Sequence, residues 1–391
     1  MKSVCVVTST RADYGILKPL ILALMDDPQI EMRLAVTGSH LSEAYGMTVD
    51  EIANEGIPID CCLPILTSAD TPRAISSAMA NALDHFSDYF NSRRPDMLIT
   101  LGDRYEIETV CCAAVNARIP IAHIHGGETT EGAIDECYRH SITKMSYLHF
   151  TACEAYRKRV IQLGEAPERV FNVGSMGVEN VMKMPKLSRD ELTEQIGFDF
   201  FKPYAVMTFH PVTLEDQTER EQCDALFAAM DEYSQLGLLI TKANADVGGR
   251  SINEVIDAYA QKRERCKAIY SLGAKRYLSS LQYAEFAIGN SSSGIIEAPS
   301  FSIPTVNIGD RQKGRLRADS VIDCEAEKNA IIDAIKTALS ERFRDVARHA
   351  HNPYGEGDTS THIAGIVKEY LLSDHINLKK KFFDVQFEVT Q

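Results

Sequence analysis

Short, nearly continuous apolar runs alternate with amphipathic stretches along most of the chain, and this alternation restricts the fold more than any other feature. Strands buried on both faces of a parallel sheet are apolar throughout, whereas the helices that cover them have apolar residues at every third or fourth position. The pattern therefore predicts a doubly wound α/β fold. The first series of expected strands covers residues 4–8, 31–37, 96–101, 119–124, 148–151 and 170–173.

The alternation starts again after residue 200, so a second domain of the same class is expected. Its expected strands cover residues 204–209, 237–241, 268–270, 286–288 and 304–308. The segment between the two series contains Pro185, Pro203 and a capping box formed by Ser188 and Glu191, which marks a helix start. We place the domain junction there. The predicted domains are residues 1–175 and 176–360, both Rossmann-like, followed by an amphipathic helix and tail at 361–391. Two such domains are expected to face a cleft that binds the ligand.

Composition excludes several classes of protein. A length of 391 residues suits two domains, and a net charge of −14 argues against nucleic acid as a partner. No apolar run approaches the length of a membrane span, and the first residues lack the apolar core of a signal peptide, so we expect a cytoplasmic protein that does not bind membranes.

No CxxC motif indicates a metal site, and the ten cysteines are expected to be buried and reduced. The tail with Lys379–Lys381 is interpreted as a solvated end.

Polar or ionisable residues follow nearly every expected strand. In doubly wound sheets, ligands bind beyond the carboxyl ends of the strands, so these segments together form the candidate site. They cover residues 9–15, 38–40, 102–104 and 123–136 in the first half, and 210–211, 243–246, 289–294 and 309–311 in the second.

Each segment alone also has a purely structural interpretation. The serines at 291–293 could only start a helix, or could bind an anion at its N-terminus. Arg11 and Arg311 could form surface ion pairs, or could clamp a diphosphate. Asp103 could cap the next helix, and His210 could be a core histidine. The position of all of them at strand ends favours function.

Residues 123–136 contain two histidines, three glycines and four carboxylates. A surface turn would explain the glycines alone, whereas a catalytic loop after a buried strand explains the whole composition. In an extended strand His123 and His125 would point to one face, and His125, next to two glycines, is closer to the site. No GxGxxG occurs at the first strand-to-helix turn and no GxxxxGK[ST] occurs anywhere, so a nicotinamide cofactor and a P-loop are not indicated.

Taken together, these segments resemble the hydrolysing UDP-N-acetylglucosamine 2-epimerases, enzymes that start the route to sialic acids. The resemblance runs from about residue 2 to about residue 372 in the same order and spacing. The matching motifs are STRADY (9–14), GSH (38–40), GDR (102–104), HIHGGE (123–128), IDE (134–136), RHSITK (139–144), FHP (209–211), GNSS (289–292) and GDRQ (309–312).

The resemblance implies a fold like that of the GT-B glycosyltransferases, with two Rossmann-like domains, a cleft and a C-terminal helix that returns to the first domain. It implies a UDP-activated 2-acetamido sugar as substrate, no cofactor, and a homo-oligomer, either dimer or tetramer. UDP would be held by Arg11, Arg104, His210, Asn244, Ser291, Ser292, Glu297 and Arg311, with Glu297 on the ribose. The acidic groups near the sugar would be Asp103, Glu128 and Asp135, with His40 close by.

The implied reaction converts UDP-N-acetylglucosamine and water to N-acetylmannosamine and UDP through a 2-acetamidoglycal. Many relatives have Glu where this chain has His125, so the acid and base stay open: Asp103 and Asp135 are expected to act with His125 or Glu128, while His210 stabilises the leaving phosphate. Residues 66–72 and 130–135 resemble a branch that acts on UDP-N,N′-diacetylbacillosamine for legionaminic acid. A GT-B glycosyltransferase and an inactive UDP-sugar sensor are the alternative functions.

Overall fold

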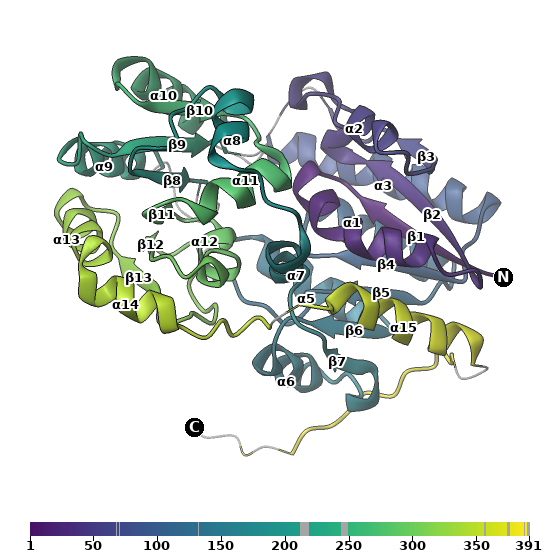
Figure 1. Ribbon diagram of the computed structural model, residues 1–391. Coiled ribbons are helices and arrows are strands. Elements are labelled where there is room, and N and C mark those ends of the chain that lie inside the picture. The colour runs from purple at the N-terminus through teal and green to yellow at the C-terminus, as the bar shows by residue number, and fades with distance from the viewer. Residues whose placement is uncertain are drawn as a thin grey trace. The chain divides into compact units, whose positions relative to one another are not determined.

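The computed structural model describes residues 1–391 except 68, 70, 132, 212–218, 244–248, 356, 374–375, 387 and 389–391. The chain forms two compact α/β units (Figure 1). Unit 1 comprises Met1–Glu128, Asp135–Met176 and Gly357–Gln391, and unit 2 comprises Thr129–Ile134 and Gly177–Glu356.

Unit 1 is built on a seven-stranded parallel sheet with the order β3-β2-β1-β4-β5-β6-β7. The chain starts in the middle at β1, extends to one edge and then returns to build the other half, so the strand order reverses between β1 and β4. The loops that follow these strands lie at the point where α/β sheets usually bind ligands. The strands are β1 (Lys2–Thr8), β2 (Ile30–Thr37), β3 (Ile59–Leu63), β4 (Met97–Leu101), β5 (Ile121–Ile124), β6 (Leu148–Thr151) and β7 (Val170–Asn172).

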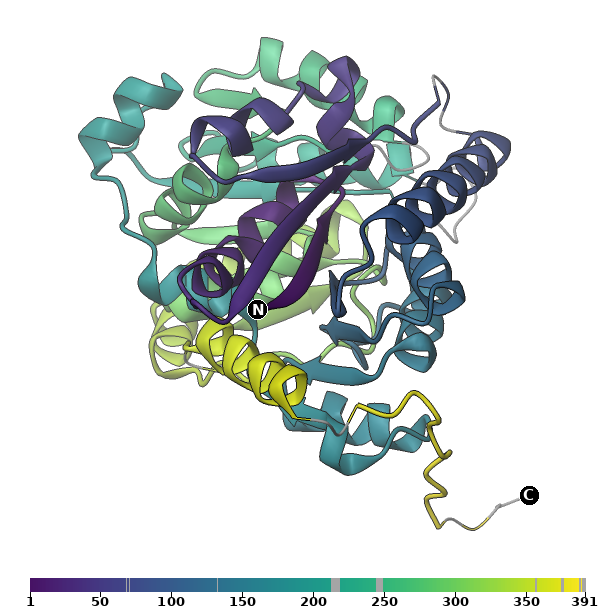
Figure 2. The same ribbon diagram turned by 90° about the vertical axis from the view of Figure 1, so that its right-hand side faces the viewer.

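Amphipathic helices cover the sheet of unit 1. The last helix, α15, packs against α1, because Ile363, Val367 and Leu371 are buried in the same apolar core as Leu17 and Leu20 (Figure 2). The helices are α1 (Arg11–Met25), α2 (Val49–Asn54), α3 (Pro72–Ser92), α4 (Tyr105–Asn116), α5 (Asp135–Met145), α6 (Glu154–Gln162) and α15 (Thr359–Leu372), with 3-10 turns η1 (Gly38–Leu41), η2 (Glu43–Tyr45) and η3 (Pro167–Arg169).

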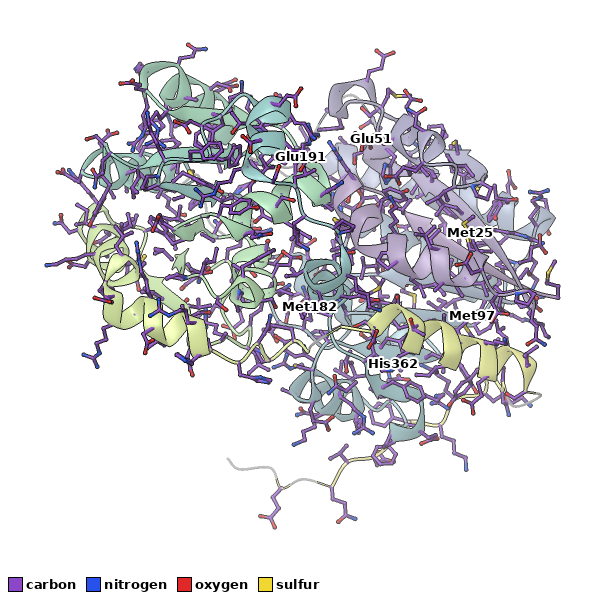
Figure 3. All side chains as sticks on the ribbon, viewed as in Figure 1. Met25, Glu51, Met97, Met182, Glu191 and His362 are labelled. Carbon is purple, nitrogen blue, oxygen red and sulfur yellow. The ribbon has the colours of Figure 1, made fainter. Side chains whose placement is uncertain are left out.

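Unit 2 repeats the architecture with a six-stranded parallel sheet of order β10-β9-β8-β11-β12-β13. The predicted capping box is present: the Ser188 side chain accepts from the Glu191 N–H, and the side chain of Glu191, labelled in Figure 3, accepts from the Ser188 N–H. The strands are β8 (Tyr204–Thr208), β9 (Gly237–Thr241), β10 (Cys266–Ile269), β11 (Phe286–Gly289), β12 (Thr305–Ile308) and β13 (Val321–Cys324). The helices are α7 (Met176–Lys183), α8 (Arg189–Ile196), α9 (Glu219–Asp231), α10 (Gly249–Lys262), α11 (Gly273–Gln282), α12 (Ser292–Ile296), α13 (Lys328–Leu339) and α14 (Glu341–His349), with η4 (Ala298–Phe301).

The prediction missed the strands β3 and β13, and both lie at sheet edges. Edge strands are half-exposed, so their sequences mix polar with apolar residues and lack the continuous apolar run of a central strand. The expectation of buried cysteines was wrong for Cys62 and Cys137, which are exposed, although all ten cysteines are free thiols. In the described part of the chain, no helix is long and apolar enough to cross a membrane.

Candidate active site

Asp13 orders the loop after β1, and the Ser39 N–H of the loop after β2 donates to the Ser9 carbonyl at 2.8 Å. The Asp13 carboxylate accepts hydrogen bonds from the backbone N–H groups of Ser9, at 3.0 Å, and Thr10, at 2.9 Å, and so forms the capping box of α1. Gly38 has φ +60°, and a Cβ there would meet the Ser9 carbonyl oxygen at 2.5 Å. The close approach of these two backbones therefore requires glycine at this position.

His40 lies inside this arrangement and is fully buried. Its Nε2 is 3.0 Å from Thr8 Oγ1, and its Nδ1 is 2.8 Å from Thr48 Oγ1. Burial lowers the pKa of His40 below its usual value, although Asp13 partly opposes this, so the ring is neutral at pH 7. In the structure His40 fixes the loop after β2, and its expected position near a sugar stays a prediction.

Arg11 starts α1, and its Nε lies 3.1 Å from Oε2 of Glu51 on α2. Glu51 is labelled in Figure 3. The pair is partly exposed, with 24% of the Arg11 side chain and 48% of the Glu51 side chain accessible. Exposed pairs of this kind contribute about 0–1 kcal/mol, so a phosphate could displace Glu51 at small cost. Arg104 is also paired, but with a buried acid: its Nε lies 3.2 Å from Oε2 of Glu106.

Asp103 follows β4 immediately after Gly102, whose φ of +83° turns the chain. It does not cap α4, because the N-cap residue of that helix is Arg104. Instead its carboxylate accepts a hydrogen bond from Nη2 of Arg139, a residue of α5. The Arg139 side chain is only 1% exposed and also donates from Nη1 to Glu136 and, at 3.1 Å, to the Glu128 carbonyl oxygen.

This buried guanidinium joins three separate parts of unit 1. Burial by itself would lower the pKa of Arg139, but the carboxylates of Asp103, Glu128 and Glu136 outweigh it and raise the pKa. Burying an arginine without partners would cost several kcal/mol, so the ion pairs are a condition of this packing. Arg139 therefore stays charged and fixes where the Asp103 and Glu136 carboxylates lie.

His125 follows β5 and adopts a left-handed backbone with φ +66°. Its Nδ1 lies 3.7 Å from Glu128 Oε1, and its N–H donates to the Phe150 carbonyl at 2.8 Å. The prediction that His123 and His125 share a face of one extended strand was wrong, because β5 ends at Ile124. His123 points into the core instead, with Nε2 2.7 Å from the Gly102 carbonyl oxygen.

Two further acids of the loop lie in the first turn of α5. Asp135 is the first residue of that helix, and Glu136 follows it. Glu136 bonds Arg139 through one oxygen, and its Oε1 lies 3.2 Å from His140 Nε2. The structure thus brings Asp103, Glu136 and Arg139 together, and places His125 beside Glu128.

In unit 2 the loops after β8 and β11 are joined by Asn290. Its side-chain oxygen accepts from the His210 N–H at 2.7 Å, and its side-chain nitrogen donates to the His210 carbonyl at 2.8 Å. Arg311 Nη1 and Gln312 Nε2 donate to the Asn290 carbonyl at 3.1 and 2.9 Å. His210 and Arg311, predicted separately, are therefore held through one fully buried amide residue.

Gly289, at the end of β11, has φ +130°, and a Cβ there would overlap the Thr208 carbonyl. Ser291 caps α12 by accepting from the Ser293 N–H at 3.4 Å, which confirms the helix-start interpretation of residues 291–293 without testing the anion site. Glu297 follows α12, and burial raises its pKa. The expected ligand-binding residue Asn244 lies outside the described residues.

With this geometry established, comparison with known proteins decides the family. The family model described as UDP-N-acetylglucosamine 2-epimerase matches residues 22–368. The chain belongs to this family. It is 40% identical to polysialic acid biosynthesis protein P7 of Escherichia coli, over 98% of both chains. It is also 40% identical to a GDP/UDP-N,N′-diacetylbacillosamine 2-epimerase (hydrolyzing) of Campylobacter jejuni, over 88% of this chain and 89% of that protein. A UDP-N,N′-diacetylbacillosamine 2-epimerase (hydrolyzing) of Legionella pneumophila is 35% identical, over 96% and 98%.

Solved structures of 2-epimerases share the fold. The Neisseria meningitidis UDP-GlcNAc 2-epimerase bound to UDP-GlcNAc superposes with a TM-score of 0.79 at 17% identity, covering 94% of this chain and all of that one. The Methanocaldococcus jannaschii UDP-GlcNAc 2-epimerase in complex with UDP-GlcNAc and UDP gives a TM-score of 0.78 at 17% identity, with the same coverage. The predicted fold of two Rossmann-like domains is confirmed.

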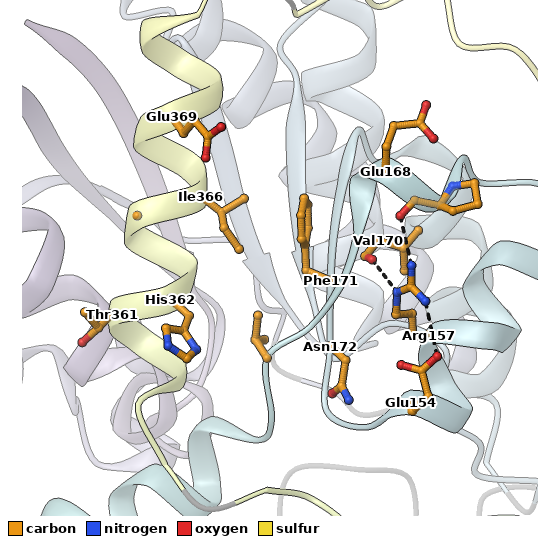
Figure 4. Close-up of a pocket in the computed structure, with 13 residues that line it drawn as sticks. Glu154, Arg157, Glu168, Val170, Phe171, Asn172, Thr361, His362, Ile366 and Glu369 are labelled. Carbon is orange, nitrogen blue, oxygen red and sulfur yellow. Dashed lines mark hydrogen bonds and ion pairs between the residues drawn. The ribbon is translucent and has the colours of Figure 1, made fainter.

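A pocket of about 590 Å³ in unit 1 lies away from the predicted site. It is bounded by α6, β7 and α15, where Arg157 donates to the Val170 carbonyl at 2.8 Å (Figure 4). None of the predicted site residues lines it. In the described part of the chain, no group of three or more His, Cys, Asp or Glu side chains is placed to hold a metal ion.

Three residues that organise the candidate site had no predicted role. Arg139 and Asn290 occur within the matching motifs, and Glu136 is adjacent to Asp135. One signal for Arg139 was available, because residues four apart on a helix share a face and Asp135 is four residues before it. Asn290 had no such signal, because its partner His210 is 80 residues away in sequence.

Proposed function

We propose that this protein is a hydrolysing 2-epimerase that converts UDP-N-acetylglucosamine and water to N-acetylmannosamine and UDP. One observation, in a chain that belongs to this family, carries the proposal. Asp103 lies just beyond the end of β4, and its carboxylate is bound by the buried Arg139, which also binds Glu136. Carboxylates held in fixed positions at a strand end suit the transfer of protons to and from a sugar.

The chemistry determines what the site must supply. The C2–H of the sugar is not acidic, since no carbonyl is conjugated with it, so the C1–O bond to UDP breaks first and positive charge builds on the ring. Loss of the C2 proton then gives a 2-acetamidoglycal. Water adds at C1 while C2 is protonated from the opposite face, which releases a free sugar of manno configuration. No net oxidation occurs, so the reaction requires no redox cofactor.

Two proton-transfer groups on opposite faces of C2 are required. We assign them to Asp103 and Asp135, acting with His125 or Glu128. His125 Nδ1 lies 3.7 Å from Glu128 Oε1, which is an ion-pair distance and longer than a hydrogen bond. In this scheme Arg139 acts through Asp103 by fixing its carboxylate.

The departing diphosphate needs positive charge and N–H donors. In the proposal, Arg311 and His210 supply these groups. The hydrogen bonds of Asn290 to both residues support this assignment, because they hold the two residues in place. The other proposed UDP ligands are Arg11, Arg104, Asn244, Ser291, Ser292 and Glu297, with His40 near the sugar. We expect a cytoplasmic homo-oligomer, either a dimer or a tetramer.

A second candidate substrate is UDP-N,N′-diacetylbacillosamine. The Campylobacter and Legionella relatives, 40% and 35% identical, are named for it, whereas the UDP-N-acetylglucosamine 2-epimerase of Neisseria meningitidis is 31% identical. The reaction at C1 and C2 would be the same, and only the substituents at C4 and C6 would differ.

The test is product identification by NMR after incubation of the protein with each UDP-sugar separately. Free UDP and a manno-configured sugar are expected, and the substrate with the higher kcat/KM is the natural one. Sugar transfer that requires an added acceptor alcohol would instead establish a glycosyltransferase. Tight binding of both UDP-sugars without turnover would establish an inactive sensor.

A further inference from the structure

The C-terminal tail is anchored to unit 1 by Lys380. Its Nζ lies 2.9 Å from the Lys144 carbonyl oxygen, 2.6 Å from the Ser146 carbonyl oxygen and 2.8 Å from Glu165 Oε2. These three bonds match the three N–H donors of an ammonium group. The expectation that Lys379–Lys381 form a solvated end was therefore wrong for Lys380, while its two neighbours are exposed.

Two of these bonds close the C-terminal end of α5. The last carbonyls of a helix have no partner inside the helix, and the negative end of its dipole favours a cation. Lys144 lies in the last turn of α5, and Ser146 directly follows the helix. Asp135 and Glu136 lie in the first turn of the same helix, and Arg139 follows them. Lys380 thus holds the C-terminal end of the helix that carries Arg139, the partner of Asp103, in its second turn.

The third bond, to Glu165, connects Lys380 through a series of side chains to the loop that contains Asp103. Glu165 is 1% exposed, and its carboxylate also contacts Lys144, at 2.6 Å, and His149, at 3.1 Å. Burial opposes the charged form, but His149, Lys144 and Lys380 outweigh it and lower the pKa of Glu165 to about 2. His149 of β6 is the register partner of His123 in β5, and His123 contacts the carbonyl of Gly102, next to Asp103.

Neighbouring residues of the tail are fixed on the same surface. The Asn377 N–H donates to the Tyr147 hydroxyl at 3.3 Å, and the Phe383 N–H donates to the Gly164 carbonyl at 2.9 Å. Lys144 Nζ lies 4.9 Å from the centre of the Phe382 ring. The family model ends at residue 368, so this tail lies beyond the part of the chain that matches the family.

We propose that Lys380 is a positioning residue for the reaction: by closing the end of α5 and binding Glu165, it holds Asp103 and Arg139 in their reactive arrangement. This proposal rests on the proposed function for its kinetic consequence. The structural consequence, a looser α5 and a looser Gly102–Arg104 loop without Lys380, is independent of it.

The kinetic test uses the full-length variant Lys380→Met, with Lys379→Met and Lys381→Met as matched controls and Lys380→Arg as the conservative change. A displacement of catalytic groups by about 1 Å can cost about 100-fold in rate, so we expect kcat of Lys380→Met to fall by about 10- to 100-fold. KM and the Kd for UDP should stay within about twofold, the controls should match the wild type, and Lys380→Arg should recover most of the loss. A kcat of Lys380→Met within about twofold of wild type, per folded molecule, would overturn the proposal.

Hydrogen exchange gives a readout that does not depend on turnover. In Lys380→Met, amides of α5 and of residues 102–104 should exchange at least about tenfold faster, whereas amides of unit 2 keep their rates. Unchanged exchange in α5 would overturn the positioning role even if the protein is active. If the wild type has no activity, the proposed function fails and the exchange data still decide this inference. If Lys380→Met does not fold, Glu165→Gln should give the same pattern with a smaller change, and unchanged exchange and kcat in that variant would overturn the proposal.

Discussion

The strand ends of the two units have the same topology but different chemistry. In unit 1 the central residue is the buried cation Arg139, which forms ion pairs with the carboxylates of Asp103 and Glu136. His125 and Glu128 lie close together on the preceding loop. In unit 2 the central residue is the neutral amide Asn290, which joins His210 to Arg311. One fold thus provides a cluster of ionisable groups in one unit and a frame of amide and backbone groups in the other.

The difference suggests a division of work within the proposed reaction. Proton transfer at C2 requires groups that change their protonation state, and these are concentrated in unit 1. Holding a diphosphate requires donors that stay fixed while charge develops, and a rigid amide frame around Arg311 suits that task. Changes at the ionisable groups around Arg139 in unit 1 should therefore lower turnover, and changes at the Asn290 frame in unit 2 should weaken UDP binding.

The largest effect is expected for Asp103→Asn. Removing a general acid or base costs about 10²- to 10⁴-fold, so kcat should fall about 10³-fold, while the Kd for UDP, measured by calorimetry, stays within about twofold. Asp88→Asn, on the exposed side of α3, is the matched control and should behave as wild type. Undiminished turnover in Asp103→Asn would remove the assignment of proton transfer to this residue.

Asn290→Ala should reduce the stability of unit 2. The substitution removes a buried amide and leaves the His210 N–H and carbonyl without their partner, which costs about 2–4 kcal/mol in the free energy of unfolding. Denaturation in urea measures this cost, and Asn329→Ala, an exposed site on α13, serves as the control. A loss below about 0.5 kcal/mol would show that Asn290 does not hold the two loops together.

Arg311→Ala separates binding from turnover. Losing charge-assisted bonds to a phosphate costs about 1.5–3 kcal/mol, so the Kd for UDP should rise about 10- to 100-fold. The exposed Arg342→Ala is the control, with no expected change. If Arg311→Ala binds UDP as the wild type does, the assignment of diphosphate binding to unit 2 loses its main support.

The smallest effect concerns acid stability, and it has opposite signs in the two units. Burial lowers the pKa of His123 to about 3 and lowers that of His149, so below about pH 6.5 the unfolded chain binds more protons at these residues than the folded chain does. Stability from these residues is present above about pH 6.5 and is lost as the pH falls, over the range from about 6.5 to about 3 for His123. Burial raises the pKa of Glu297 in unit 2, so its contribution increases on acidification.

Calorimetry between pH 7 and 5 measures this difference. On going from pH 7 to pH 5, the unfolding temperature of unit 1 should fall by more than that of unit 2. His123→Gln should make the fall in unit 1 smaller. Equal shifts in both transitions would contradict the assigned direction of these pKa changes.

The features that the sequence predicted are those that depend on local order. Central strands such as β1 and β4 are buried on both faces, so their apolar runs identify them, whereas the half-exposed β3 and β13 gave no such signal. The strand-end rule located the loops of the candidate site because it depends only on where strands stop.

Side-chain partners distant in sequence could not be predicted. Asp103 and Arg139 are 36 residues apart, and Lys380 and Glu165 are 215 apart, so their contacts depend on the register of the sheet and the path of the tail. The backbone conformation of His125 could not be predicted either. Because this residue adopts a left-handed conformation after β5 ends, strand alternation did not give the direction of its side chain.

The most direct test of the account follows the hydrogen at C2 during a single turnover in deuterated water. Excess protein is mixed with the better of the two UDP-sugars, and the released sugar is examined by NMR and mass spectrometry. The account predicts one deuterium at C2 of every manno-configured product molecule, because the original proton is removed and replaced from the opposite face. A free sugar that keeps its original hydrogen at C2 would contradict elimination and rehydration at this site.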